Sequence, residues 1–126
     1  MSASQALAAA AADALRAVAA LSGVHDALPI QAAPPYATVE AGLETDWGHK
    51  SGGGREVRLT VTLRDEGERP TRLRALAAAA EAALGGLEAV AGWQLVTLVF
   101  VRSMTAAQSV GKWVTVMDYR ARLLAA

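Results

Sequence analysis

The residues most suggestive of chemistry form a glycine-rich segment, Gly48–Gly54, which contains Lys50 and Ser51. A phosphate-binding loop needs a glycine, four further residues and then Gly-Lys-Ser or Gly-Lys-Thr, with a helix opening directly after it. Here His49 separates Gly48 from Lys50, and a strand pattern follows, so no helix N-terminus would point its amides at a phosphate. The pattern favours an exposed loop tip. A small ligand-binding module using Gly48–Gly54 stays as an alternative, which a loss of nucleotide affinity in Lys50→Ala would support.

Two histidines and two aspartates could in principle ligate zinc: His25, Asp26, Asp46 and His49. Their spacing fits neither one helix face nor a short hairpin, and two of them are adjacent. A turn after the first helix, with Asp26 bonding backbone amides, is the simpler interpretation. The sequence therefore predicts no metal site and no cofactor.

A carboxylate cluster at Asp65, Glu66 and Glu68 offers the only hydrolytic arrangement of acids. These residues are expected in an exposed turn, where burial cannot tune a pKa for acid–base catalysis. Negative charge just before a helix also stabilises the helix dipole. No Gly-x-Ser-x-Gly nucleophile motif is present. The sequence predicts that the protein is not an enzyme.

Length and composition narrow the class further. The 126 residues predict one domain, residues 1–126, with a core that depends on few large side chains because much of its apolar content is alanine. The net charge is zero, which disfavours tight binding to nucleic acid. Cysteine is absent, and no signal peptide or apolar run of roughly 18 residues is visible, so we expect no membrane contact and assembly in the cytoplasm.

Two helices are predicted from apolar residues that recur every three or four positions. The first covers Ser4–Leu21, with Ser2 or Ser4 as N-cap and Gly23 as a C-terminal cap. The second covers Arg69–Leu84, and its buried stripe is expected at Leu73, Leu76, Ala80 and Leu84.

Four strands are predicted, at Tyr36–Glu40, Arg55–Arg64, Trp93–Arg102 and Lys112–Leu123. The first two should form a hairpin around a long loop, Glu44–Gly54. The third is apolar on both faces and is therefore expected in the sheet centre. Residues Ser103–Val110 are expected to loop back.

Together these elements predict a two-layer α+β domain, a mostly antiparallel four-stranded sheet with two helices packed on one face. The second sheet face would carry an apolar group formed by Val96, Leu98, Phe100, Val114 and Val116. A monomer of this size should not leave that surface in water, so a neighbouring subunit is expected to cover part of it.

Arginine accounts for ten of the twelve basic residues and suits protein interfaces, because it forms bidentate pairs with carboxylates. Glu40, Glu44, Glu56 and Asp118 are possible partners across subunits. Trp47 is either an interface anchor or a side chain that folds back over the sheet, and the arginines otherwise form a solvated face. The candidate interface residues are Trp47, His49, Lys50, Arg55, Arg58 and Arg64.

A series of short motifs has a recognisable order: Gly23-Val24-His25-Asp26, Pro34-Pro35-Tyr36, Asp46-Trp47, a glycine-rich loop, an alternating strand and Asp65-Glu66-Gly67. This order resembles the phage tail terminator or tail-completion family, in a form close to that of alphaproteobacterial gene transfer agents. The resemblance covers nearly the whole chain.

The resemblance implies a structural subunit that assembles into a hexameric ring in the neck region of a tailed particle. Such a ring ends polymerisation of the tail tube protein and joins the tail to the head-side connector or stopper protein. DNA would pass through the lumen without specific binding. Another head–tail neck or closure protein is the alternative within the same class.

Overall fold

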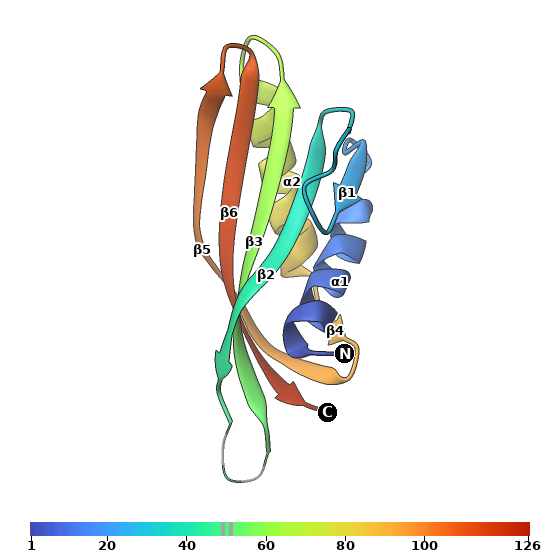
Figure 1. Cartoon of the computed structure of the whole chain (residues 1–126), viewed down its shortest axis with the longest axis vertical. Coiled ribbons are helices and arrows are strands. Elements are labelled where there is room, and N and C mark those ends of the chain that lie inside the picture. Colours follow the sequence, from blue (N-terminus) through green and yellow to red (C-terminus); the bar gives the residue numbers. More distant parts are fainter. Residues whose placement is uncertain (49, 51) are drawn as a thin grey trace.

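The computed structural model of the chain describes residues 1–48, 50 and 52–126. Within these residues the helices and strands follow the order shown in Figure 1: α1 (Ala3–Arg16), β1 (Gly23–His25), β2 (Tyr36–Asp46), β3 (Gly54–Glu66), α2 (Thr71–Gly85), β4 (Ala89–Val90), β5 (Trp93–Ser109) and β6 (Lys112–Ala125). Both helices lie on one face of a single curled sheet, so the predicted two-layer α+β class is confirmed. No helix in this part of the chain is long and apolar enough to cross a membrane.

Helix α1 is shorter than its apolar periodicity predicts. Ser2 is the N-cap: its Oγ accepts the backbone N–H of Gln5, and the Gln5 side chain accepts the backbone N–H of Ser2. The helix ends at Arg16 rather than Leu21, because short i→i+3 turns replace its last predicted turn and redirect the chain into β1. Gly23 opens that strand, so its predicted capping role is wrong.

The sheet has six strands in the order β1-β2-β3-β6-β5-β4, not the predicted four. β1 pairs with β2 in parallel, and the other pairings are antiparallel. The two strands that the sequence missed, β1 and β4, have only three and two residues. A stretch this short cannot show the alternation by which strands are predicted.

The predicted β2–β3 hairpin is present but longer than expected. β2 continues past Glu40 to Asp46, and Thr45 and Asp46 pair with Glu56 and Arg55. A bulge between Ala41 and Glu44 hides the alternation in this half of β2. Both ends of the predicted loop, Glu44–Asp46 and Gly54, are therefore strand, and the two strands form an arm that extends past the helices at the lower end of Figure 1.

Strand β5 lies near the sheet edge, so the predicted central position is wrong. It covers Trp93–Ser109 and includes most of the segment predicted to loop back. On its outer side β4 pairs only with Trp93 and Gln94. The centre belongs to β3 and β6, which pair over their full lengths.

Three bulges interrupt the pairing of β5 with β6, leaving Val96, Val101 and Gln108 without a direct partner. Each inserted residue reverses the alternation of faces, and residues opposite each other in antiparallel strands share a face. Leu98 and Phe100 pair with Ala121 and Tyr119 of the helix-covered face, so their predicted place on the second face is wrong. Val114 and Val116 do lie on the second face, as predicted, because they alternate with buried residues of β6.

The core lies between the helices and the strands β2, β3 and β6. The predicted stripe of α2 is fully buried, and so are the four alternating apolar residues of β3: Val57, Leu59, Val61 and Leu63. This packing covers one face of the central strands and leaves the other face open.

Candidate partner interface

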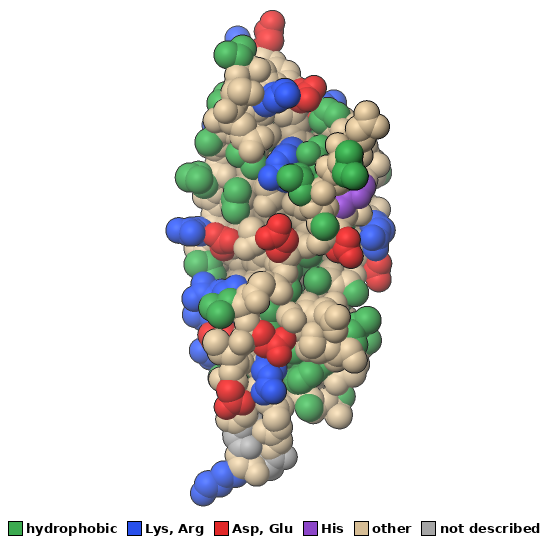
Figure 2. Space-filling model, in the orientation of Figure 1, with side chains coloured by type: hydrophobic (Ala, Val, Ile, Leu, Met, Phe, Trp, Pro, Cys, Tyr) green, Lys and Arg blue, Asp and Glu red, His purple; other side chains and the backbone are tan. Residues whose placement is uncertain are grey.

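The sheet face opposite the helices, called the open face below, carries most of the charged side chains of the central strands. Figure 2 shows this face, where charged and hydrophobic side chains are mixed. Register and alternation place six basic and four acidic side chains on it, a surplus of two positive charges: Arg58, Arg64, Arg102, Lys112, Arg120 and Arg122 with Glu40, Glu56, Glu66 and Asp118.

Ion pairs within the chain neutralise much of this charge. The Nε of Arg102 lies 2.8 Å from Oδ2 of Asp118, whose other oxygen accepts the Thr60 hydroxyl at 2.9 Å. The hydrogen bond from Arg102 lowers the pKa of Asp118 against the opposing effect of burial. The Nε of Arg122 similarly lies 3.1 Å from a carboxylate oxygen of Glu56. These pairs order the face but leave it weakly charged overall.

Arg58 and Arg64, two predicted interface residues, lie on the open face. Arg58 is exposed and Arg64 half-buried. Among the described residues, no carboxylate oxygen lies within ion-pair distance of either guanidinium group, and Arg64 reaches only the hydroxyl of Thr38, at 3.5 Å. Both guanidinium groups are therefore available to bind an acidic group of a partner.

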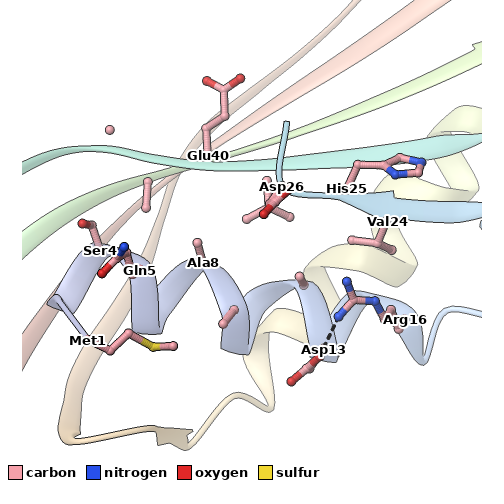
Figure 3. A pocket seen from close by; sticks show the side chains of 15 residues that line it. Met1, Ser4, Gln5, Ala8, Asp13, Arg16, Val24, His25, Asp26 and Glu40 are labelled. Carbon is pink, nitrogen blue, oxygen red and sulfur yellow. Dashed lines mark hydrogen bonds and ion pairs between the residues drawn. The ribbon is translucent and has the colours of Figure 1, made fainter. Parts of the chain in front are cut away.

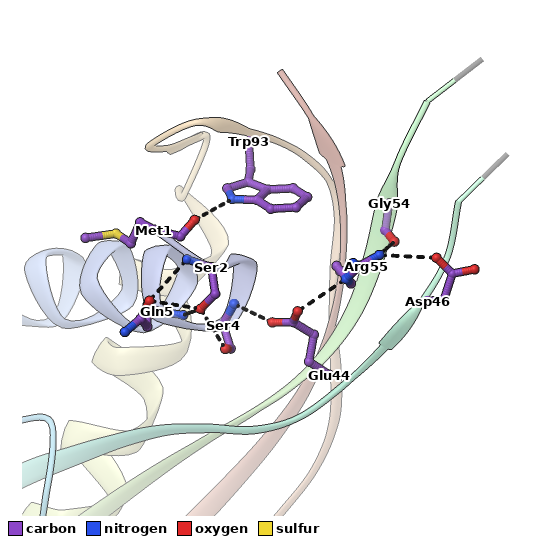
Figure 4. Close-up of polar contacts among 9 residues, drawn as sticks. All are labelled: Met1, Ser2, Ser4, Gln5, Glu44, Asp46, Gly54, Arg55 and Trp93. Atoms are coloured by element: carbon purple, nitrogen blue, oxygen red, sulfur yellow. Dashed lines mark hydrogen bonds and ion pairs between the residues drawn. The ribbon is translucent and has the colours of Figure 1, made fainter. Parts of the chain in front are cut away.

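Arg55, a third predicted residue, is engaged within its own chain (Figure 4). Its Nε lies 3.3 Å from Glu44 and its terminal nitrogen 3.2 Å from Asp46. Glu44 also accepts the backbone N–H of Ser4 at 2.9 Å. The structure thus links the β2–β3 arm to the start of α1 through Arg55 and Glu44.

Trp47 and Lys50 lie at the end of the arm. The Trp47 ring is half-buried, and the guanidinium carbon of Arg122 lies 5.4 Å from its centroid, within the range of a cation–π contact. This contact is the one expected of a tryptophan that folds back onto the sheet. Lys50 is exposed, and the predicted residue His49 lies outside the described residues.

The described candidates therefore do not form one patch. Arg58 and Arg64 lie along the open face, whereas Trp47, Lys50 and Arg55 gather at the arm. A role for any of them in partner binding stays a prediction.

Strand β5 is the feature that sequence reasoning misjudged. It exposes five large apolar side chains on both of its faces: Val96, Val99, Phe100, Val101 and Met104, of which Met104 is 64% exposed. So many exposed apolar side chains on one strand of a small domain indicate a contact site. In the sequence, the apolar run Leu98–Val101 before Arg102 fits an uncovered edge strand as well as a strand in the sheet centre.

The other candidate chemistries find structural roles. Asp65 is buried rather than exposed, which corrects the prediction, because it accepts hydrogen bonds from the Arg72 guanidinium and from the Glu66 backbone N–H. The Arg72 contact lowers the pKa of Asp65, the opposite of what a general acid needs. His25 packs edge-on against Tyr36. No cluster of metal-ligating side chains occurs among the residues that the structure describes.

Comparison with known proteins agrees with a structural role. The model of the family described as tail completion protein gp17 matches residues 5–124. A solved chain from a structure titled "Virion of native gene transfer agent (GTA) particle" is similar in fold, with a TM-score of 0.64, 23% identity and 94% of each chain covered. No curated protein matches the chain significantly. The family resemblance seen in the sequence is thus confirmed, and the chain belongs to the tail completion protein gp17 family, as a structural component of a phage-like tail and not an enzyme.

Proposed function

We propose that the protein is the tail terminator of a tailed, phage-like particle, either a gene transfer agent or a phage. Six copies form a ring at the head-proximal end of the tail tube. The ring ends polymerisation of the tube protein and joins the tail to the head-side connector. The family match over residues 5–124 carries this proposal, and the similar fold of a gene transfer agent chain of nearly equal length supports it.

The open face suits the wall of a lumen through which DNA passes. It carries a surplus of two positive charges per copy, and its ion pairs Arg102–Asp118 and Arg122–Glu56 occupy much of its arginine. A strongly basic wall would bind phosphates and retard the DNA. A nearly balanced wall allows passage without specific binding.

Termination follows from a ring with two different faces. One face repeats the contact that successive rings of tube protein make with each other, and the other face presents a surface that the tube protein does not fit. The exposed end of the β2–β3 arm is the segment we assign to one of these axial contacts, since it extends beyond the helices (Figure 1).

Electron microscopy of particles from a strain in which the gene is deleted tests the proposal. Loss of the terminator should give unattached tails of irregular or excessive length beside filled heads without tails. Restoring the gene from a plasmid should restore joined particles of uniform tail length. Normal tails on normal heads in the deletion strain would contradict the proposal, and headless tails of uniform length would assign the protein to the head side of the neck.

A further inference from the structure

A groove of about 820 Å³ runs between α1 and the outer edge of β2 (Figure 3). Ala8 of the helix, Val24 of β1 and Val39 of β2 contribute apolar side chains to its lining. The groove continues the line of β1, which ends at His25 while β2 runs on beside it. The space next to β2 is therefore shaped like the place of a missing strand.

The backbone of β2 is free along this groove. β1 pairs only with Tyr36–Thr38, and no described residue pairs with the outer edge of β2 from Val39 to Asp46. Unpaired N–H and C=O groups on a sheet edge are a template for an added strand. An extended segment in the groove would bond to this edge and cover the apolar side chains of α1.

Two acids on the rim of the groove lack an ion-pair partner among the described residues. Asp13 forms an ion pair with Arg16, but Asp26 and Glu40 have no cationic partner within 4 Å among the described residues. The Glu40 side chain points from β2 to the side opposite α1, so this acid lies where the groove meets the open face (Figure 3). The occupant that fits is an apolar strand with a positive charge.

Strand β5 has these properties. Its outer edge is unpaired from Leu95 to Ser109 among the described residues, and its exposed side chains are apolar. The one charged side chain in this stretch is Arg102, which is 78% exposed. Followed through β6 and β3, Leu95–Phe100 of β5 lie level with Ala41–Asp46 of β2, the part of its edge that β1 leaves free.

The directions of the strands also match. β2 and β5 are separated by three antiparallel steps, so they run in opposite directions within one sheet. Rotation of a second copy about an axis along the strands places its β5 antiparallel to the first copy's β2. Glu40, Thr60, Asp118 and Arg102 form one row across the sheet, and this rotation sets Arg102 level with Glu40 of the next copy.

We propose that β5 of one copy occupies the groove of the next copy and extends its sheet by antiparallel pairing with β2, with Arg102 beside Glu40 on the open face. The inference rests on the proposed ring and names the contact that builds it. Because the two edges differ, the contact is head-to-tail and can repeat until a ring closes. A two-fold β5–β5 contact would instead bring arginines together and leave Glu40 without a partner.

Cysteine cross-linking in purified particles tests this contact, and the chain has no cysteine of its own. Gly42 lies on the free part of β2 and has no atom within 4 Å of an added side chain, and Val101 is exposed on β5. Particles carrying Gly42→Cys together with Val101→Cys are treated with a short bis-maleimide. Ala78→Cys on the exposed side of α2 replaces Gly42→Cys in the control.

The expected result is a ladder of covalent multimers in the double variant, at least tenfold stronger than in the Ala78→Cys control, and none in either single variant. Circular dichroism of the purified variants checks that they fold. Particles that contain the chain without the ladder would overturn the contact while leaving the terminator function intact. Dimers of Val101→Cys alone, or its cross-linking to another tail protein, would also overturn it. Absence of the chain from particles would refute the proposed function, and the contact with it.

Discussion

Replacing Asp65 with asparagine should lower the free energy of unfolding by about 2 kcal/mol. The carboxylate is 6% exposed at the end of β3. It accepts the Nε of Arg72 at 2.8 Å and the backbone N–H of Glu66 at 2.8 Å. A hydrogen bond to a charged group contributes about 1.5–3 kcal/mol. Arg72 is 59% exposed, so solvent screens the pair and the loss belongs in the lower half of that range.

The pH dependence of this loss has a definite sign. The pKa of Asp65 is lowered in the folded protein, so the stabilisation is complete above the usual aspartate value of 3.8 and disappears as the pH falls through the lower folded value. Urea unfolding at about pH 7 should therefore separate Asp65→Asn from the natural protein, and the difference in unfolding free energy should shrink as the pH falls below 3.8.

Asp13→Asn is the matched control, because Asp13 and Arg16 form a pair in which both side chains are more than half exposed. Its effect should stay below about 0.5 kcal/mol. Equal losses of unfolding free energy in the two variants would refute the assignment of Asp65 as a buried residue that links β3 to α2. A loss for Asp65→Asn that does not change with pH would also refute it.

Three further changes test the packing by thermal or urea unfolding. Leu59→Ala should cost about 2–5 kcal/mol because Leu59 is fully buried, whereas exposed Leu43→Ala should cost less than about 0.5, and similar losses would contradict the core assignment. Tyr119→Phe should be neutral or stabilising, since the buried hydroxyl has no hydrogen-bond partner among the described residues; a loss above about 1 kcal/mol would reveal one. Gly54→Ala should destabilise the arm, because the added Cβ would lie 2.5 Å from the backbone oxygen of Trp47. The control Gly53→Ala places its Cβ within 4 Å of no atom and should leave the unfolding free energy unchanged.

The sequence was most informative where one periodicity runs without interruption. Val57, Leu59, Val61 and Leu63 alternate over the whole of β3, and the predicted stripe of α2 is the buried one. In both cases a single regular element packs one face against the core, so the spacing of its apolar residues directly predicts which side chains are buried.

The spacing of apolar residues gave wrong predictions where β-bulges change the register of β5 against β6. Val96 and Val101 are extra residues in β5, and each one moves the following side chains to the other face. Edge strands and central strands can also have similar sequences, because a strand covered by a neighbouring subunit needs the same apolar residues as one covered by helices of its own chain. The misplacement of β5 and of Leu98 and Phe100 has this physical origin.

The candidate site was harder to predict than the fold. Arg55 was proposed for a partner but binds Glu44 and Asp46 of its own chain, whereas Arg58, on the open face, forms no ion pair with any described residue. Residue type alone does not separate these cases, because which acids lie near an arginine depends on strand register. The exposed edge of β5 and the groove beside β2 could be identified only from the strand order and pairing.

Cryo-electron microscopy of intact particles is the most direct test of the terminator role. We expect a ring of six copies of this chain between the last ring of tube protein and the head-side connector, with open faces toward the lumen. Density for the chain at the distal end of the tail, or on the particle surface as separate monomers, would contradict it.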